Sequence, residues 1–263
     1  MTVFSNDPTV SVILSDPLSR YVQMLEADEL RPDDHQRQIM EKLQSLHHDL
    51  MDYEVRLSKK QGVVSRLFGK ARKVDFPKGL YVHGDVGRGK SMIMDLFFEA
   101  APIQAKRRVH FHSFMLEIHK AMHEWRYMDK AARKEMHGTD EDDPIPPLAA
   151  KIAKSSLLLC FDEFQVTDVT DAMILGRLFS NLFDRGVVMV LTSNRTPDDL
   201  YAGGLNRELL TPAIEMMKEN LEVASLNGPI DYRLERMKGI QVYYHPLSDD
   251  ATKSLSKAFW QMT

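Results

Sequence analysis

The residues best suited to chemistry lie in one stretch of eight positions with the pattern G-x-x-x-x-G-K-[ST]. The stretch is Gly84-Asp85-Val86-Gly87-Arg88-Gly89-Lys90-Ser91, and Met92 follows it at the start of a helical pattern. Its glycines let backbone N–H groups face phosphates, Lys90 offers a cation, and Ser91 offers a hydroxyl to Mg²⁺. The helix N-terminus adds its positive end to the same place. Residues 84–92 are therefore predicted to bind ATP; the alternative is a glycine-rich turn that binds nothing.

A second group of candidates ends the apolar run 157–161, which is followed by Asp162 and Glu163. At a strand tip Asp162 can hold magnesium, directly or through water, and Glu163 can orient and deprotonate an attacking water. Together with the loop upstream, the two acids predict hydrolysis rather than binding alone. The alternative is a buried strand that ends in surface acids.

The third candidate is Asn194, which with Ser193 follows the apolar run 187–192. If this strand lies beside the strand of Asp162, the amide of Asn194 can hydrogen-bond the γ-phosphate or the attacking water. The alternative is an asparagine that caps a turn before Thr196 and Pro197.

The elements that must position these residues follow from the hydrophobic pattern. From residue 79 onward, short apolar runs alternate with amphipathic stretches, which predicts an α/β fold with a parallel sheet of five strands covered by helices. The expected strands are 80–83, 109–111, 157–161, 187–192 and 221–226, and a further strand-like run is 241–245. The expected helices are 17–30, 33–58, 91–101, 114–128, 168–183 and 207–219. The proline-containing stretch 130–147 is expected to be a polar excursion from the alternation.

The composition of the chain bears on its partners and on its cellular compartment. The chain has 263 residues, a net charge of -4 and 43% hydrophobic residues, so it is predicted to be globular with no specific nucleic-acid partner. Its one cysteine, Cys160, excludes an internal disulfide and favours a reducing compartment. No secretory or mitochondrial leader pattern and no run of about 18 apolar residues is present, so the cytoplasm is expected.

Two further patterns have ordinary explanations. The basic stretch 59–73 is interpreted as a solvated linker helix, with a peripheral membrane contact as the alternative. His110 and His112 alternate along an expected strand, which puts both on one face, and His119 and His123 are four apart on an expected helix. Neither pair is completed by cysteines or carboxylates, so packing is favoured over a metal site.

Three phrases make the chain similar to a known family. These are residues 109–115 (VHFHSFM), 159–168 (LCFDEFQVTD) and 192–194 (TSN), extended by residues 200–201, 204–207 and 231–234. They resemble the ZapE family of AAA+ ATPases, related to mitochondrial AFG1-like ATPases, over roughly 75–247. The resemblance implies an ATPase, expected to be a homo-oligomer, that acts in the cytoplasm, associates with FtsZ at the division site and destabilises its polymers. Because no transit peptide is visible, the bacterial version fits better than the mitochondrial one. The resemblance also implies that relatives continue past Thr263, so an incomplete or absent C-terminal lid is expected.

Likeness to AAA+ proteins makes Arg207 a candidate for the arginine that reaches a neighbouring subunit's γ-phosphate. The alternative is a surface arginine paired with Glu208 or Glu215. Arg233 is left open between a second phosphate sensor and a residue that locks the sheet to the next segment.

The expected organisation is an N-terminal helical segment with its basic linker (1–75), an ATPase core (76–238) and a C-terminal segment (239–263). The N-terminal segment is expected to help close the adenine pocket. Two other function classes stay open: a nucleotide-dependent binding switch with negligible turnover, and, less well supported, a P-loop kinase.

Overall fold

The computed structural model describes residues 16–61, 76–204, 206–228, 252–253 and 256, and its centre is one sheet of five parallel strands. The strands are β1 (Gly79–His83), β2 (Lys106–His110), β3 (Leu158–Asp162), β4 (Val188–Ser193) and β5 (Leu221–Ser225). Their order is β2-β3-β4-β1-β5, and each neighbouring pair is parallel. The predicted five-stranded parallel sheet is confirmed. β3 and β4 are buried along their whole length, as expected for strands covered on both faces.

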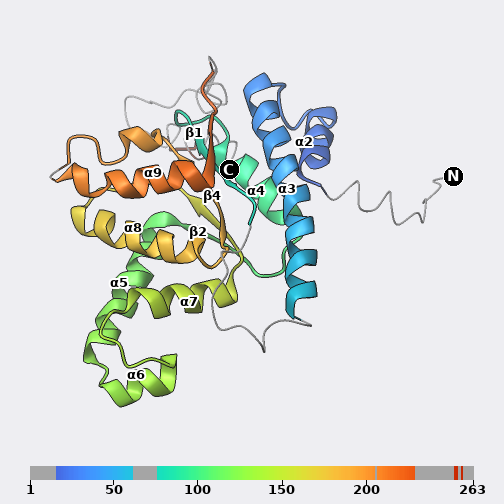
Figure 1. Cartoon of the computed structure of the whole chain (residues 1–263). Coiled ribbons are helices and arrows are strands. Elements are labelled where there is room, and N and C mark those ends of the chain that lie inside the picture. The colour runs from blue at the N-terminus through green and yellow to red at the C-terminus, as the bar shows by residue number, and fades with distance from the viewer. Residues whose placement is uncertain (1–15, 62–75, 205, 229–251, 254–255, 257–263) are drawn as a thin grey trace.

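Helices cover both faces of the sheet (Figure 1). One layer packs on the face of Leu80 and Val82 and consists of α2 (Pro17–Glu26), α3 (Asp34–Gln61) and α4 (Lys90–Ala100). The other packs on the face of Tyr81 and consists of α5 (Phe111–Tyr127), α7 (Ile145–Ser155), α8 (Val169–Phe183) and α9 (Thr211–Asn220). Among the described helices, none combines the length and apolar character needed to cross a membrane.

The two N-terminal helices begin within one residue of the predicted positions, but α2 ends at Glu26 and not at residue 30 as predicted. The Asp16 side chain accepts a hydrogen bond from the Ser19 N–H (2.8 Å), which caps the start of α2. In α3 the residues that recur every three or four positions are all buried: Ile39, Leu43, Leu46, Leu50 and Tyr53. These side chains join the core on one face of the sheet, so α3 is an integral part of that layer.

The predicted strand 109–111 is wrong in its bounds, because β2 spans Lys106–His110 and Phe111 is the first residue of α5. β2 lies at one edge of the described sheet, where half-exposed basic side chains are tolerated. At the N-terminus of α5, the ring of Phe111 packs against that of Phe164, with the ring centroids 4.4 Å apart. His110 therefore ends a strand while His112 lies in a helix, and the prediction that they share one strand face is also wrong.

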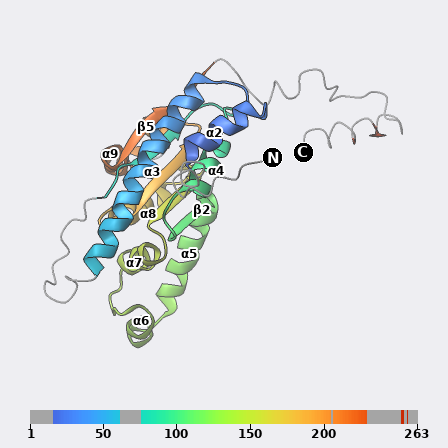
Figure 2. The same ribbon diagram turned by 90° about the vertical axis from the view of Figure 1, so that its right-hand side faces the viewer.

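The stretch 130–147 departs from the alternation of strands and helices, as predicted, because three helices follow one another between β2 and β3. It contains α6 (Lys130–His137) and the first turn of α7. Asp129 caps α6, and Gly138 ends it with a positive φ of 74°. Pro146 and Pro147 fall in the first turn of α7, where a proline removes no helical hydrogen bond. Figure 2 shows α6 at the far end of α5, away from the sheet.

The predicted helix 207–219 begins later, at Thr211, and Arg207 lies instead in a short 3₁₀ helix, η2 (Arg207–Leu209). Pro212 sits in the first turn of α9, and a helix that continued from residue 207 would have this proline in its interior. Three predictions fall outside the described residues: the strand 241–245, the basic stretch from residue 62, and both readings of Arg233.

Candidate functional site

The candidate site lies at the carboxyl ends of β1, β3 and β4, the edge where parallel sheets usually bind ligands. β4 lies between the other two strands and ties them together. The Gly84 N–H donates to the Ser193 carbonyl (3.1 Å), and the Phe164 N–H donates to the Thr192 carbonyl (2.7 Å). The glycine loop after β1 and the acidic turn after β3 are therefore both fixed to the end of one strand.

The glycine loop, residues 84–89, connects β1 to α4. Gly87 and Gly89 have φ of 82° and 86°, a region that favours glycine. Lys90 is the first residue of α4, and its Nζ donates to the carbonyls of Gly84 and Asp85 (2.8 Å each). The loop wraps around the N-terminus of a helix with an ammonium group inside the bend, an arrangement suited to phosphate.

Arg88 anchors this loop to α3, a contact that sequence reasoning missed. The Arg88 side chain is 2% exposed, and its guanidinium donates to Asp33 Oδ2 (2.9 Å) and to the Leu226 carbonyl (3.0 Å). The Gln36 amide donates to the Arg88 carbonyl (3.0 Å). A Cβ added to Gly89 would lie 2.8 Å from Gln36 Nε2, so α3 packs tightly against the loop. No local pattern links positions so far apart in the chain.

Asp162 is the buried acid of the site, with its side chain 5% exposed. Its Oδ1 accepts from the hydroxyls of Thr192 and Ser91 (3.3 Å for Ser91), and its Oδ2 accepts from Arg108 (2.9 Å). Burial on its own raises the pKa of Asp162, but the Thr192 hydrogen bond and the Arg108 guanidinium outweigh it, so the pKa is below the usual value. A carboxylate beside a serine hydroxyl supplies the hard oxygen ligands that Mg²⁺ prefers, so these residues fit the metal.

Glu163 follows Asp162 with a positive φ of 54°, which is rare for a residue other than glycine. Its N–H donates to Asp162 Oδ1 (3.2 Å) and to Thr192 Oγ1 (3.3 Å), which holds this turn. The Glu163 side chain is 73% exposed, and its Oε2 lies 3.9 Å from His110 Nδ1. A carboxylate held at the site edge and open to solvent can reach a water molecule.

Asn194 directly follows β4 and is exposed. The hydrogen bonds that cap the turn come from its neighbours: Ser193 Oγ accepts from the Arg195 N–H (3.1 Å), and Thr196 Oγ1 accepts from the Asp199 N–H (3.2 Å). The capping role considered for Asn194 is thus carried by Ser193 and Thr196.

Arg207 is half-buried in η2, and its guanidinium donates to the Asp198 carbonyl in η1 (Pro197–Asp199). Glu215, one of the acids considered as its partner, lies 3.5 Å from Lys218. Sequence reasoning also missed Arg108 and Thr192: Arg108 because the expected strand began after it, and Thr192 because it lies in an otherwise apolar run.

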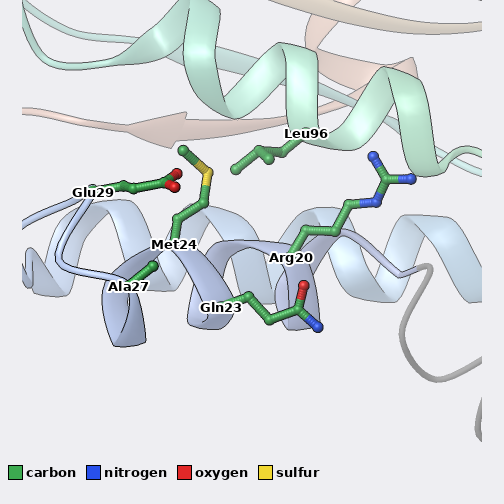
Figure 3. A pocket seen from close by; sticks show the side chains of 6 residues that line it. All are labelled: Arg20, Gln23, Met24, Ala27, Glu29 and Leu96. Atoms are coloured by element: carbon green, nitrogen blue, oxygen red, sulfur yellow. The ribbon is translucent and has the colours of Figure 1, made fainter. Parts of the chain in front are cut away.

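A surface hollow of about 500 Å³ lies between α2 and α4 (Figure 3). Its lining residues are Arg20, Gln23, Met24, Ala27, Glu29 and Leu96. None of them belongs to the glycine loop, so this hollow is separate from the candidate site.

Comparisons with known proteins agree with the resemblance inferred from the sequence. The family model described as AFG1-like ATPase matches residues 15–263. The chain is 35% identical over 246 residues to the cell division protein ZapE of Escherichia coli K12, covering 92% of the chain and 62% of that protein. It is 42% identical over 187 residues to lactation elevated protein 1 homolog B of Danio rerio, covering 71% of the chain and 37% of that protein. The chain thus spans less than two thirds of either relative.

Among solved structures, DnaA from Aquifex aeolicus with AMPPCP bound gives a TM-score of 0.47 at 13% identity. That match covers 86% of this chain and 57% of the DnaA chain. Since this structural likeness is weak, the family assignment rests on the sequence matches.

Proposed function

Because this chain belongs to the AFG1-like ATPase family, we propose that it hydrolyses ATP to ADP and phosphate in a magnesium-dependent reaction. One observation carries the proposal: Ser91, at the start of the helix after the glycine loop, lies 3.3 Å from the carboxylate of Asp162 at the tip of β3. Two segments that are distant in sequence thus place a hydroxyl and a carboxylate side by side, and both are oxygen ligands of the kind that Mg²⁺ prefers.

Each residue of the site has a proposed role. The N–H groups of residues 84–92 surround the phosphates, and Lys90 exchanges its carbonyl acceptors for phosphate oxygens. Ser91 and Asp162 hold Mg²⁺, which when bound offsets negative charge on the phosphates. Glu163 accepts a proton from the attacking water, and Asn194 orients the γ-phosphate or that water.

Beyond a single subunit, the proposals depend on the family. We propose that the chain acts as a homo-oligomer in which Arg207 completes the site of a neighbouring subunit, with FtsZ polymers as the partner in the bacterial cytoplasm. Support comes from the E. coli relative, which is named a cell division protein. Three further statements remain predictions: the divisions at residues 75 and 238, the adenine contact of the N-terminal helices, and the membrane contact of residues 59–73.

The test of hydrolysis compares wild type with Lys90→Ala and Glu163→Gln. We expect Lys90→Ala to lose ATP binding, and Glu163→Gln to bind ATP with near wild-type affinity while turnover falls at least 100-fold. Glu219→Gln, which changes an exposed carboxylate on α9, is the control and should hydrolyse normally. Calorimetry measures binding and phosphate release measures turnover. Retained turnover in Glu163→Gln would refute the assignment, and binding without turnover in wild type would favour the nucleotide switch.

The partner proposal has its own test. FtsZ polymers are sedimented with the chain and ATP, with the chain and ADP, and alone. Less polymer in the ATP sample supports the proposal, whereas equal pellets in all three samples remove FtsZ as the partner and leave the ATPase proposal standing. Turnover per subunit that rises with protein concentration supports the homo-oligomer; constant turnover per subunit counts against a site completed by Arg207 of a neighbour.

A further inference from the structure

Arg108 connects two carboxylates that belong to different elements. Its guanidinium lies against Asp95 of α4 and, at 2.9 Å, against Asp162 Oδ2 of β3. The Arg108 side chain is 25% exposed, so this charge is partly shielded from water. Ser91 donates to the other oxygen of the same Asp162 carboxylate, so the arginine and the proposed metal ligand Ser91 share one acid.

Without a neighbouring cation, this corner of the site would attract metal. Asp95, Asp162 and Ser91 supply two carboxylates and a hydroxyl, which are ligands suited to a divalent cation even when nucleotide is missing. The guanidinium of Arg108 supplies one positive charge to this pair of acids and bonds one oxygen of Asp162. A second cation at the same place is repelled by Arg108, and that repulsion is strong where water is partly excluded.

We infer that Arg108 is a positioning residue for the metal site: it holds the Asp162 carboxylate and prevents a divalent cation from binding the Asp95–Asp162 pair before nucleotide arrives. The metal then enters together with ATP, whose phosphates supply the negative charge that Arg108 has neutralised on the protein. This inference rests on the proposed function, because it takes Asp162 as a metal ligand.

Mn²⁺ binding to the nucleotide-free chain tests the inference, with free Mn²⁺ measured by electron paramagnetic resonance. We expect weak binding by wild type and binding at least tenfold tighter by Arg108→Gln. Arg108→Lys keeps the charge and should stay weak. The matched control is Arg107→Gln, since Arg107 is the neighbouring arginine on β2 and pairs with Glu117 (2.6 Å). It should bind Mn²⁺ like wild type.

A second substitution locates the new site: adding Asp95→Asn to Arg108→Gln should abolish the gain. If Arg108→Gln does not fold by circular dichroism, Arg108→Met provides the same comparison. Equal Mn²⁺ affinity in wild type and the charge-removing variant overturns the inference, as does tight Mn²⁺ binding by nucleotide-free wild type. Since no ATP is present, failure of the ATPase proposal is seen separately, as absence of phosphate release by wild type.

Discussion

The buried ion pair between Arg88 of the glycine loop and Asp33 at the start of α3 is expected to contribute both to the stability of the fold and to nucleotide affinity. The side chains of Arg88 and Asp33 are 2% and 4% exposed, and their charged groups are 2.9 Å apart. Arg88→Ala leaves Asp33 without that cation and the Leu226 carbonyl without that donor. Removal of one partner from a buried pair costs about 3–5 kcal/mol. We therefore expect the free energy of unfolding to fall by that amount, and Tm by about 10 °C.

The same substitution should weaken nucleotide binding. Arg88 fixes the loop before ATP arrives, and without it the loop must be ordered during binding. The cost of ordering about one residue is roughly 1–2 kcal/mol, which corresponds to about a tenfold rise in the Kd for a non-hydrolysable ATP analogue.

Urea denaturation measures the stability and calorimetry measures the Kd. Arg37→Ala is the control, because Arg37 pairs with Glu41 on the surface of the same helix and its side chain is 68% exposed. This control should lose less than about 0.5 kcal/mol. In a double-mutant cycle, Asp33→Asn should cost much less in the Arg88→Met background than in wild type, because without the guanidinium the buried charge of Asp33 carries most of the penalty. A loss for Arg88→Ala as small as that for Arg37→Ala, or strict additivity in the cycle, would refute the reasoning.

Three further predictions concern single positions. Gly89→Ala should weaken ATP binding at least tenfold, as measured by calorimetry, because φ is 86° and the new Cβ would clash with the Gln36 side chain. The control is Gly203→Ala, which is also at positive φ but has open space around it and should bind ATP normally. Burial raises the pKa of the Cys160 thiol to about 12, so Ellman's reagent at pH 8 should react at least 100-fold more slowly with native than with urea-unfolded chain; equal rates would contradict this. Burial lowers the pKa of His47 in the folded state. As the pH falls below about 6.5, the imidazole is therefore protonated more readily in the unfolded chain, and the free energy of unfolding should decrease. His47→Leu should reduce this slope in urea titrations at several pH values, and an unchanged slope would exclude His47 as its source.

Much of the fold could be predicted because local patterns determine it. The apolar runs of β3 and β4 are continuous since both faces of these strands are buried, and the period of Ile39 to Tyr53 marks the buried side of α3. β2 was misplaced because its first residues are basic, so hydrophobicity located only its end. α7 is not among the expected helices, because the stretch that contains its start is polar and rich in prolines, although the first turn of a helix accepts proline.

The residues predicted for the site are those that share a short motif or a strand tip. The structure brings the glycine loop and Asp162 together through Ser91, as the paired motifs predict. Arg108 and Asp33 could not be predicted from the sequence. Arg108 reaches Asp162 because of the register between β2 and β3, and Asp33 reaches Arg88 because α3 packs against the glycine loop. Their roles depend on tertiary contacts between distant segments.

The order of the strands has a consequence for the timing of synthesis. β1 pairs with β4 and β5, so its hydrogen-bonded neighbours leave the ribosome only after the whole segment from α4 to α8 has been made. At typical translation rates this interval is on the order of ten seconds. During it the glycine loop is covalently complete, but the Ser193 carbonyl that receives the Gly84 N–H does not yet exist. A nascent chain that ends before β4 therefore carries the whole phosphate-binding motif and lacks the support that shapes it.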